Sequence, residues 1–581
     1  MKTRYAIRIA LVLMILITAC EDDFLDRRPL DTPIAEDYWS TPSELMYYVN
    51  QFYLRFRDGG QWSMGIQGFD LGTDDLVESV PSSFWNGEKV AQVSGAGWNY
   101  KWIRKINYFF ENYSKCKAPF DEYKQYLGEA YFFRALLYFE LVRSYGDVPW
   151  VDEVLDEDSP ELYTPRTSRN VVVDSIIADL DRAAAYMISG NNQDRERLNR
   201  ETALLYKSRV CLFEGTWEKY HEGTAFGVPG SDYEHFLEEA VSAAEEAMAS
   251  GMFSIYKKDN NPETDYYSMF NSLDLSENTE VLLQKKWAKS FEFVHEHKSR
   301  IAQPAGIGMT RSIVNDYLCS DGKPITTSPL YRGDDNLDSL VLNRDPRLLQ
   351  TMNTRGDVLE RKNGEVIKSF DIPILESRGR KKKYHTKTGY MMKKGGLPDM
   401  ELRVAGEDDS PSILFRYAEL LLNFAEAKAE LGTLTQSDVD QSINLLRDRV
   451  GMVPMDISSI DHDPNWLYPE VSALINEVRR ERHIELSFEG FRKYDILRWR
   501  AHHLFAGKRP KGMRFVQEDY PDLVPGTDLF VDEDGLLDPM QHSLPSGYGF
   551  RPGQDYLLPI PLNQLELNPN LKQNPGWPDK E

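Results

Sequence analysis

The sequence predicts an all-α fold of paired helices that is interrupted by a long irregular insertion. Residues 128–149 are apolar on nearly all sides at 3.6 residues per turn, so a helix there must be buried inside a stack. Further stretches of helical periodicity follow at short intervals, and short connections make neighbouring helices antiparallel. From residue 253 to about 409 this periodicity fades, and Gly, Pro, Asn and Asp punctuate the chain.

Several of the expected helices have recognisable ends. Thr41 and Glu44 form a capping box, with Pro42 at the first helical position. Gly146 is placed to end the long helix in the left-handed conformation, and Pro149 prevents its continuation. In chain order, the expected helices span residues 41–56, 98–115, 121–145, 168–187, 201–218, 233–250, 413–431, 437–450 and 471–487. Residues from 498 to the C-terminus are rich in proline and predict loops.

Four charged side chains interrupt the apolar helix at 128–149: Glu129, Arg134, Glu140 and Arg143. Burying an unpaired charge is costly. We therefore expect these side chains, Arg134 and Glu140 among them, to be paired. Removing one partner of such a pair should destabilise the fold.

The N-terminus predicts secretion and lipid attachment. Lys2, Arg4 and Arg8 precede an apolar run at residues 9–19, which is about half the ~20 residues that a transmembrane helix needs and is typical of a secretory signal. The run ends directly before Cys20, as in a lipobox, where this thiol carries diacylglycerol. The acidic residues 21–23 resemble a signal for surface export, with a solvated linker as the alternative.

Charge and cysteine content exclude some classes of protein. The formal net charge is −24 and becomes −27 once the three basic residues of the signal are removed, which argues against a nucleic-acid partner. Cys116, Cys211 and Cys319 are an odd number of scattered thiols without a Cys-x-x-Cys pair. They predict neither a disulfide framework nor a metal site.

Eight motifs along the mature chain resemble, in order, those of the SusD/RagB family of outer-membrane lipoproteins. They are CEDDFLDRRP at Cys20, GEAYFFRALLYFELVRSYGDVPW at Gly128, NRDPRL at Asn343, TGYMMKKG at Thr388, ILFRYAELLLNFAEAKAELG at Ile413, NLLRDRVGM at Asn444, ERHIELSFEGFRKYDILRW at Glu481 and YLLPIPLNQLELNPNLKQNPGW at Tyr556. The resemblance implies about four tetratricopeptide-like helix-pair repeats with an inserted binding region. It also implies nutrient capture for a SusC-like TonB-dependent transporter.

The expected domain organisation follows from these features. Residues 1–19 form a lipoprotein signal peptide, 20–40 a lipidated tether and 41–250 the N-terminal helical region. Residues 251–410 form the irregular insertion that contributes to ligand binding, and 411–581 the SusD/RagB C-terminal region.

A search for catalytic groups leaves one constellation, formed by Glu485, Glu489, Arg492 and Asp495. Their spacing could align them on one helical face, and paired carboxylates can hydrolyse glycosidic bonds. Several arginines lie within the same turns, however, and a facing arginine lowers the pKa of a carboxyl group, whereas a general acid needs a raised one. We therefore interpret the constellation as structural and predict no enzyme activity.

The candidate metal sites also lack essential ligands. His295 and His297 are two residues apart, which does not fit a His-Glu-x-x-His helix, and we expect a solvated pair. The loop that begins at Asp461 has Trp466 and Ser472 where a calcium loop needs glycine and glutamate. We predict no metal and no cofactor.

Aromatic residues in loops are the strongest indication of a binding site. Flat rings stack on the apolar face of a sugar, while nearby polar side chains bind its hydroxyl groups. The resemblance places binding aromatics in the loop before the long helix and in the insertion. The predicted ligand-binding residues are Trp62, Trp85, Trp98, Trp287 and Phe291, with Trp217 as a further loop aromatic. Trp102, Trp150, Trp499 and Trp577 are expected in the core, and an exposed ring could instead contact the transporter.

The sequence thus predicts a surface lipoprotein that binds an oligosaccharide and delivers it to a SusC-like transporter without a catalytic step. It is expected to sit in the outer membrane through its lipid, facing the cell exterior. A RagB-like peptide-binding protein is the alternative within the same family. A lipid-anchored glycoside hydrolase would need catalytic carboxylates, and a purely structural helical scaffold would not need aromatic, glycine-rich loops.

Overall fold

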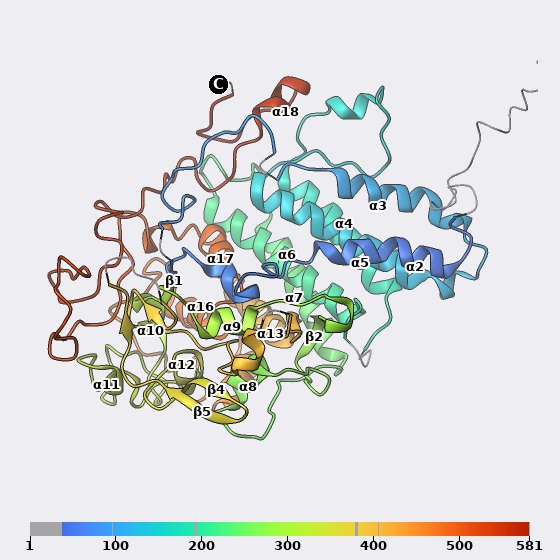
Figure 1. The fold of residues 1–581 in the computed structure, drawn as a ribbon. Helices are drawn as coiled ribbons and strands as arrows, with labels where there is room; N and C mark the ends of the chain where they lie inside the picture. The colour runs from blue at the N-terminus through green and yellow to red at the C-terminus, as the bar shows by residue number, and fades with distance from the viewer. Residues whose placement is uncertain are drawn as a thin grey trace, which may run out of the picture.

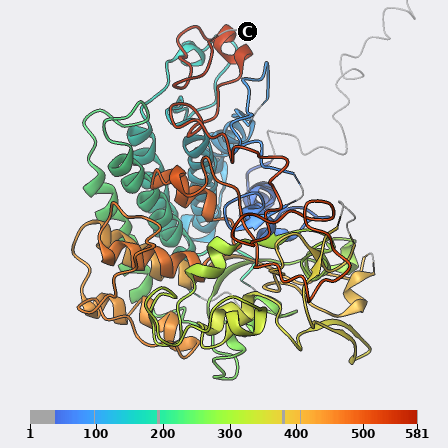
Figure 2. The same ribbon diagram turned by 90° about the vertical axis from the view of Figure 1, so that its left-hand side faces the viewer.

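The computed structural model describes residues 38–78, 80–95, 97–190, 195–377, 382–404 and 406–579. The predicted signal sequence and Cys20 lie outside these residues. Helices form a stack on one side of the molecule, and the irregular insertion lies beneath this stack in both ribbon views (Figures 1 and 2). Within the described ranges, no helix has the combination of length and hydrophobicity that a membrane span requires.

The stack is built from helices that precede and follow the insertion. These are α2 (Pro42–Asn50), α3 (Lys101–Asn112), α4 (Lys124–Tyr145), α5 (Arg169–Tyr186), α6 (Arg200–His221) and α7 (Tyr233–Ala249), followed after the insertion by α13 (Tyr417–Glu430), α14 (Gln436–Asp440), α15 (Ile443–Arg449), α16 (Ala473–Glu485) and α17 (Arg492–Arg498). Each of α3 to α7 contacts the next, α13 packs on α6 and α7, and α16 packs on α13. The mainly helical fold class is confirmed, whereas the number of tetratricopeptide-like repeats stays a prediction.

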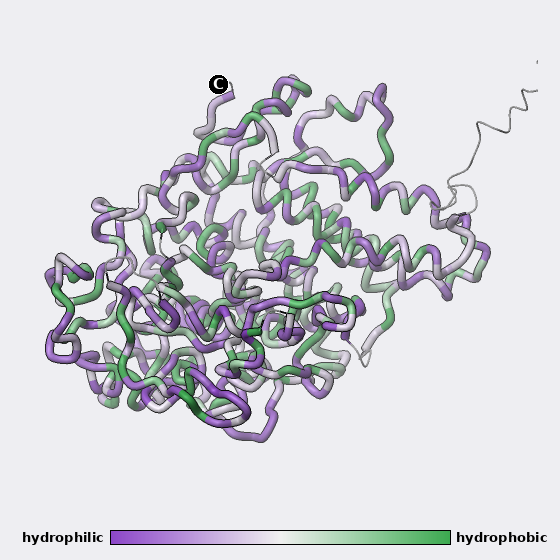
Figure 3. The backbone as a smooth tube through the Cα atoms, in the orientation of Figure 1, coloured by the Kyte–Doolittle hydropathy of each residue, from purple (hydrophilic) through white to green (hydrophobic). Residues whose placement is uncertain are grey.

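Helix α4 lies at the centre of the stack, as its all-round hydrophobicity predicts. Its aromatic residues are buried against α2, α3, α5 and α6. The capping box at Thr41 forms, with the Thr41 backbone N–H donating to Glu44 at 2.8 Å. Gly146 ends α4 at a positive φ of 72°, which glycine adopts without strain, although its ψ of −118° lies outside the predicted left-handed helical conformation. Figure 3 shows hydrophobic residues running through the stacked helices and hydrophilic stretches in the outer loops.

Three of the four charged residues, Glu129, Arg134 and Glu140, pair with other parts of the fold, whereas Arg143 lies over the rings of Phe139 and Tyr494 and, contrary to the prediction, has no carboxylate partner among the described residues. Arg134 forms a bidentate ion pair with Asp179 of α5, at 2.6 and 2.8 Å. Glu129 pairs with Arg197 at 2.6 Å, and Glu140 with Arg57 at 3.2 Å.

The Arg134–Asp179 pair predicts a large loss of stability in a variant. Arg134→Ala should lower the free energy of unfolding by about 3 kcal/mol, because it leaves the Asp179 carboxylate buried without its main partner. Arg182→Ala is the matched control, since Arg182 contacts the same carboxylate at 3.2 Å but its side chain is 50% exposed, and its loss should cost less than about 1 kcal/mol. Denaturant melts of both variants measure the difference. Equal stability of the two variants would contradict the interpretation of Arg134 and Asp179 as a buried ion pair that stabilises the fold.

The insertion is irregular, as predicted, and contains short helices and strands. The helices are α8 (Asp265–Asn271), α9 (His297–Ala302), α10 (Arg311–Asp316), α11 (Leu337–Val341) and α12 (Pro346–Thr351). The strands pair as β1 (Leu76–Val77) with β3 (Gly308–Met309), β2 (Val281–Lys285) with β8 (Ser412–Arg416), β4 (Val358–Lys362) with β5 (Glu365–Ser369), and β6 (Ile374–Leu375) with β7 (His385–Thr386). The antiparallel β2–β8 pair brings both ends of the insertion to one place beside the helical stack. The predicted domain boundaries themselves stay a prediction.

Two of the predicted helices differ from the observed elements. Residues 412–416 form strand β8 instead of the first turn of a helix, because they pair with β2. The helix predicted at 437–450 is divided into α14 and α15. At the break, the Ser442 hydroxyl donates to the Asp438 carbonyl at 2.5 Å, an example of a serine side chain competing for backbone groups.

The C-terminal segment has few helices, as its prolines predict. It runs from α17 along the insertion and returns to the top of the stack, where α18 (Leu562–Leu567) lies near α3 (Figure 1). Cys116, Cys211 and Cys319 are buried free thiols.

Candidate functional site

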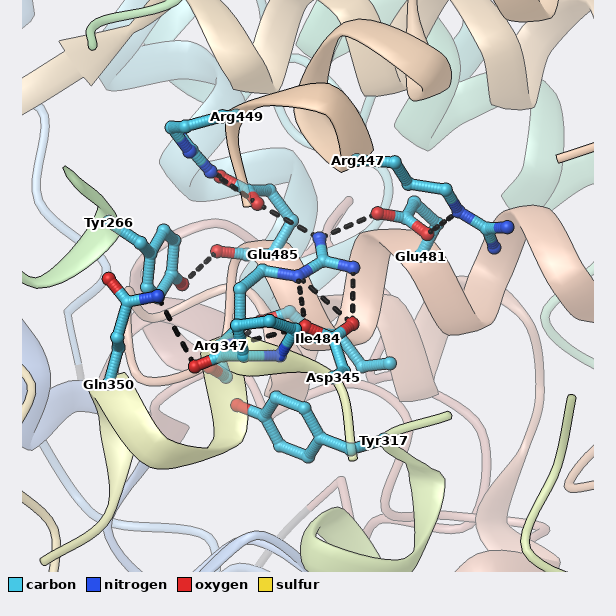
Figure 4. Close-up of polar contacts among 12 residues, drawn as sticks. Tyr266, Tyr317, Asp345, Arg347, Gln350, Arg447, Arg449, Glu481, Ile484 and Glu485 are labelled. Carbon is cyan, nitrogen blue, oxygen red and sulfur yellow. Dashed lines mark hydrogen bonds and ion pairs between the residues drawn. The ribbon is translucent and has the colours of Figure 1, made fainter. Parts of the chain in front are cut away.

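Glu485, the first residue of the acid and base constellation, belongs to a buried ionic network (Figure 4). Glu485 binds Arg449 at 2.6 Å, Arg416 at 2.8 Å and Arg347 at 3.1 Å. These arginines come from α15, β8 and α12, so the network joins the insertion to the helical stack. The residues belong to four of the sequence motifs, NRDPRL, ILFRYAEL, NLLRDRVGM and ERHIELSFEG, which therefore have a common structural role.

Nearby arginines favour the ionised form of the constellation's carboxylates, and that form is unsuited to donating a proton. Arg449, Arg416 and Arg347 overcome the effect of burial and lower the pKa of Glu485. Arg416 and Lys394 do the same for Glu489, as Arg482 and Arg498 do for Asp495. The interpretation of these carboxylates as members of structural ion pairs is confirmed. The partners of Glu485 and Glu489, however, are arginines from distant segments and not the predicted arginines of the same helical turns.

Burial raises the pKa of several other carboxyl groups among the described residues, and for two of them the pKa reaches about 7. Burial, the nearby Asp75 and other groups raise the pKa of Asp70 to about 7, and burial with Glu214 raises that of Glu218 to about 7. Asp70 is buried and accepts the Gly490 backbone N–H at 2.9 Å, and Glu218 lies in α6 and accepts the Ser231 hydroxyl. Neither lines a cavity described below.

Three of the predicted loop aromatics are core residues, which corrects the predicted platform. Trp85 is 2% exposed and packs on Phe505 with ring centroids 4.2 Å apart. Trp287 is 5% exposed and stacks on Phe293 at 4.2 Å. Trp217 is buried within α6. No ring face of Trp85, Trp287 or Trp217 is free for a ligand, because the packing of long loops onto the stack has covered them.

Trp62 and Phe291 are exposed, by 61% and 84% respectively. The segments that carry them are linked by backbone hydrogen bonds. The Glu296 N–H donates to the Gln61 carbonyl at 3.0 Å, and the His297 ring donates to the Gly60 carbonyl at 2.9 Å. The two rings therefore belong to neighbouring loops.

His295 and His297 are buried, so the prediction of a solvated pair is wrong. The two rings stack with centroids 3.8 Å apart, where the insertion meets the loop that follows α2. His295 lies 3.3 Å from Asp408, and burial with the adjacent His295 lowers the pKa of His297 to about 4. Among the residues that the structure describes, no cluster of His, Cys, Asp or Glu side chains could hold a metal ion.

Trp98 lines a cavity with a volume of about 490 Å³ at the top of the stack. The half-buried indole packs edge-on against Tyr145 at 5.0 Å and lies 5.9 Å from Tyr100. The cavity lies between the start of α3, the connection at residues 149–163 and α18. We call this space the Trp98 cavity. It has the size of a small-molecule site.

Hydrogen bonds hold the walls of the Trp98 cavity together. Tyr100 donates its hydroxyl to the Pro149 carbonyl at 3.0 Å, and Asn107 donates its amide to the carbonyls of Val151 and Glu153. The Asn568 amide donates to the carbonyls of Leu162 and Thr164 and thereby fixes the C-terminal segment over the cavity.

The lining combines apolar surface with polar groups at the edge. Tyr163 is exposed at the rim, and Lys101, Glu161 and Gln564 provide ammonium, carboxylate and amide groups. An aromatic face beside such donors and acceptors can bind the apolar and the hydroxyl-bearing sides of a sugar.

Sequence reasoning identified Trp98 but missed its surroundings. Tyr100 and Tyr163 were not singled out, and Gln564 and Asn568 belong to the C-terminal motif without any sign of their spatial position. Of the core predictions, Trp499 and Trp577 are buried, Trp150 stacks on Tyr138 at 4.2 Å, and Trp102 is half-buried below Lys105.

This architecture is that of a mainly helical protein with a cavity of the size of a small-molecule site. The family model of the SusD family matches residues 254–577, more than half of the chain. A second model, described as starch-binding associating with outer membrane, matches residues 82–212. The chain belongs to the SusD family.

Known proteins are similar to most of the chain in sequence or in fold. SusD-like protein P2 of Formosa agariphila is 24% identical over 98% of each chain. A SusD-like carbohydrate-binding protein of Bacteroides fragilis has a TM-score of 0.67 and 22% identity, covering 92% of this chain and all of that one. A laminarin-binding SusD-like protein has a TM-score of 0.55 and 18% identity, covering 93% of this chain and all of that one.

Proposed function

We propose that this protein binds an oligosaccharide at the cell surface and delivers it to a SusC-like TonB-dependent transporter. The observation that carries the proposal is the Trp98 cavity in a chain of the SusD family. The indole face would cover one side of a sugar ring, while Lys101, Glu161 and Gln564 would bind hydroxyl groups. Relatives named as carbohydrate-binding and laminarin-binding support the choice of ligand.

The exposed rings of Trp62 and Phe291 form a second part of the proposal. They lie on linked loops and are exposed enough to stack on a sugar or to pack against the transporter. Binding experiments on the isolated protein distinguish the two roles, because a contact with the transporter leaves glycan affinity unchanged.

We further propose that binding involves no chemical step. The paired carboxylates suited by spacing to hydrolysis are held ionised by arginines. Incubating the protein with a panel of neutral and acidic oligosaccharides should therefore show binding without product release. Turnover of any glycan would contradict this part of the proposal. Binding of peptides instead of glycans would favour the RagB-like alternative.

The lipid anchor yields a separate prediction. If Cys20 carries diacylglycerol, Cys20→Ala should move the protein from the outer-membrane fraction to the soluble fraction while its melting temperature stays the same. Cys116→Ala is the control, since that thiol is buried in the fold and its replacement should leave membrane attachment intact. Retention of the Cys20→Ala variant in the membrane would refute lipid anchoring at this residue.

A further inference from the structure

A second cavity, of about 320 Å³, is electropositive although the chain as a whole carries a net charge of −24. It lies between α4, α6, β8, α17 and the loop that follows α2. Eight lysine or arginine side chains line it, against four carboxylates. We call it the basic cavity.

The carboxylates of the basic cavity are already neutralised. Glu140, Glu419, Glu489 and Asp495 each lie within 3.2 Å of an arginine nitrogen. These four carboxylates are therefore not available to pair with the other lysine and arginine side chains that line the cavity.

Three lining cations, Arg55, Arg143 and Lys493, have no carboxylate partner among the described residues. Arg143 lies over the rings of Tyr494 and Phe139, at 4.0 and 4.7 Å, and Lys493 lies 3.8 Å from the Phe84 ring centroid. The Nε atoms of Arg55 and Arg143 are buried without a hydrogen-bond acceptor. Buried polar groups are normally satisfied, and the Arg55 and Arg143 side chains therefore have hydrogen-bonding capacity left for an acceptor that enters the cavity.

The titration of neighbouring groups reflects the same positive potential. Arg143, with Lys493 and Arg57, lowers the pKa of the Tyr494 phenol. Burial and the like charges of Lys89, Arg57 and Arg143 lower the pKa of Lys493. An anion in the cavity would relieve this repulsion.

We infer that the basic cavity binds the oxyanion of an acidic sugar, a carboxylate or a sulfate ester. A planar guanidinium binds either group through two parallel hydrogen bonds, and an ammonium adds a point charge. Arg57 is 64% exposed at the edge of the cavity, which leaves a path from solvent. The inference rests on the proposed function and narrows the ligand to oligosaccharides that carry negative charge.

Three probes of equal length test it by calorimetric titration: tetragalacturonate with carboxylates, a carrageenan tetrasaccharide with sulfates, and neutral laminaritetraose. The variants are Arg143→Gln, Lys493→Gln and the double variant. Lys258→Gln is the control, because Lys258 is exposed and is not among the residues that line the basic cavity. At least one acidic probe should bind more than tenfold more tightly than the neutral one, and which one binds distinguishes carboxylate from sulfate.

The double variant should lose at least tenfold in affinity for the acidic probe. Its affinity for the neutral probe and its melting temperature should change little. Added salt should weaken binding of the acidic probe more in the native protein than in the double variant. If Arg143→Gln unfolds, Lys493→Gln alone should still weaken binding of the acidic probe.

Two results would overturn the inference. In the first, laminaritetraose binds as tightly as the acidic probes. The inferred preference for charged sugars is then wrong, whereas the proposed binding of oligosaccharides stands. In the second, acidic probes bind the double variant as tightly as the native protein. If no oligosaccharide of any kind binds, the proposed function fails together with the inference.

Discussion

Glu485→Ala is expected to destabilise the protein by about 5 kcal/mol, the upper end for a broken buried ion pair. The reason is that Glu485 neutralises Arg347, Arg416 and Arg449 at once, and all four side chains are buried. Each buried guanidinium group would lose one carboxylate partner, and only Asp345 and Glu481 would remain for Arg347, Glu280 and Glu489 for Arg416, and Glu280 for Arg449. Because these arginines belong to α12, β8 and α15, the insertion and the helical stack should unfold together.

Glu365→Ala is the matched control for this variant. Glu365 is an exposed residue of β5, and its replacement should change stability by less than about 0.5 kcal/mol. Thermal and denaturant melts of both variants provide the comparison. A Glu485→Ala variant that melts normally but no longer binds glycan would show that the network is a binding site instead of a structural one.

Trp98→Ala should weaken oligosaccharide binding about five- to thirtyfold while leaving the fold intact. A ring that covers a sugar face typically contributes more than ~1 kcal/mol, and central contacts more than ~2 kcal/mol. The Trp98 indole is half-buried at a cavity wall, so its removal should cost little stability. Trp85→Ala, in the same loop, should show the opposite pattern, since deleting a buried tryptophan costs about 3–5 kcal/mol.

Much of the helical stack could be predicted from the sequence because its signals are local. The capping box at Thr41, the glycine stop at Gly146 and the apolar faces of α4 to α7 are each contained within one helix. Strand β8 was missed because its pairing partner β2 lies more than a hundred residues away, and no local pattern reports it.

The candidate site was harder to predict because it depends on packing between distant segments. Trp85 and Trp98 lie in one glycine-rich loop and look alike in the sequence, yet Phe505 from the C-terminal region covers only Trp85. The walls of the Trp98 cavity come from residues near 100, 150 and 565. The basic cavity was not anticipated either, since its lysines and arginines are spread over five segments of an acidic chain.

Calorimetric titration of the mature protein with neutral and acidic oligosaccharides tests the central claim most directly. The native protein should bind at least one of them, Trp98→Ala should bind the same ligand at least fivefold more weakly with an unchanged melting temperature, and no ligand should be cleaved. Equal affinity of Trp98→Ala and the native protein would contradict the assignment of the Trp98 cavity. If the native protein binds none of the oligosaccharides, glycan capture itself is wrong.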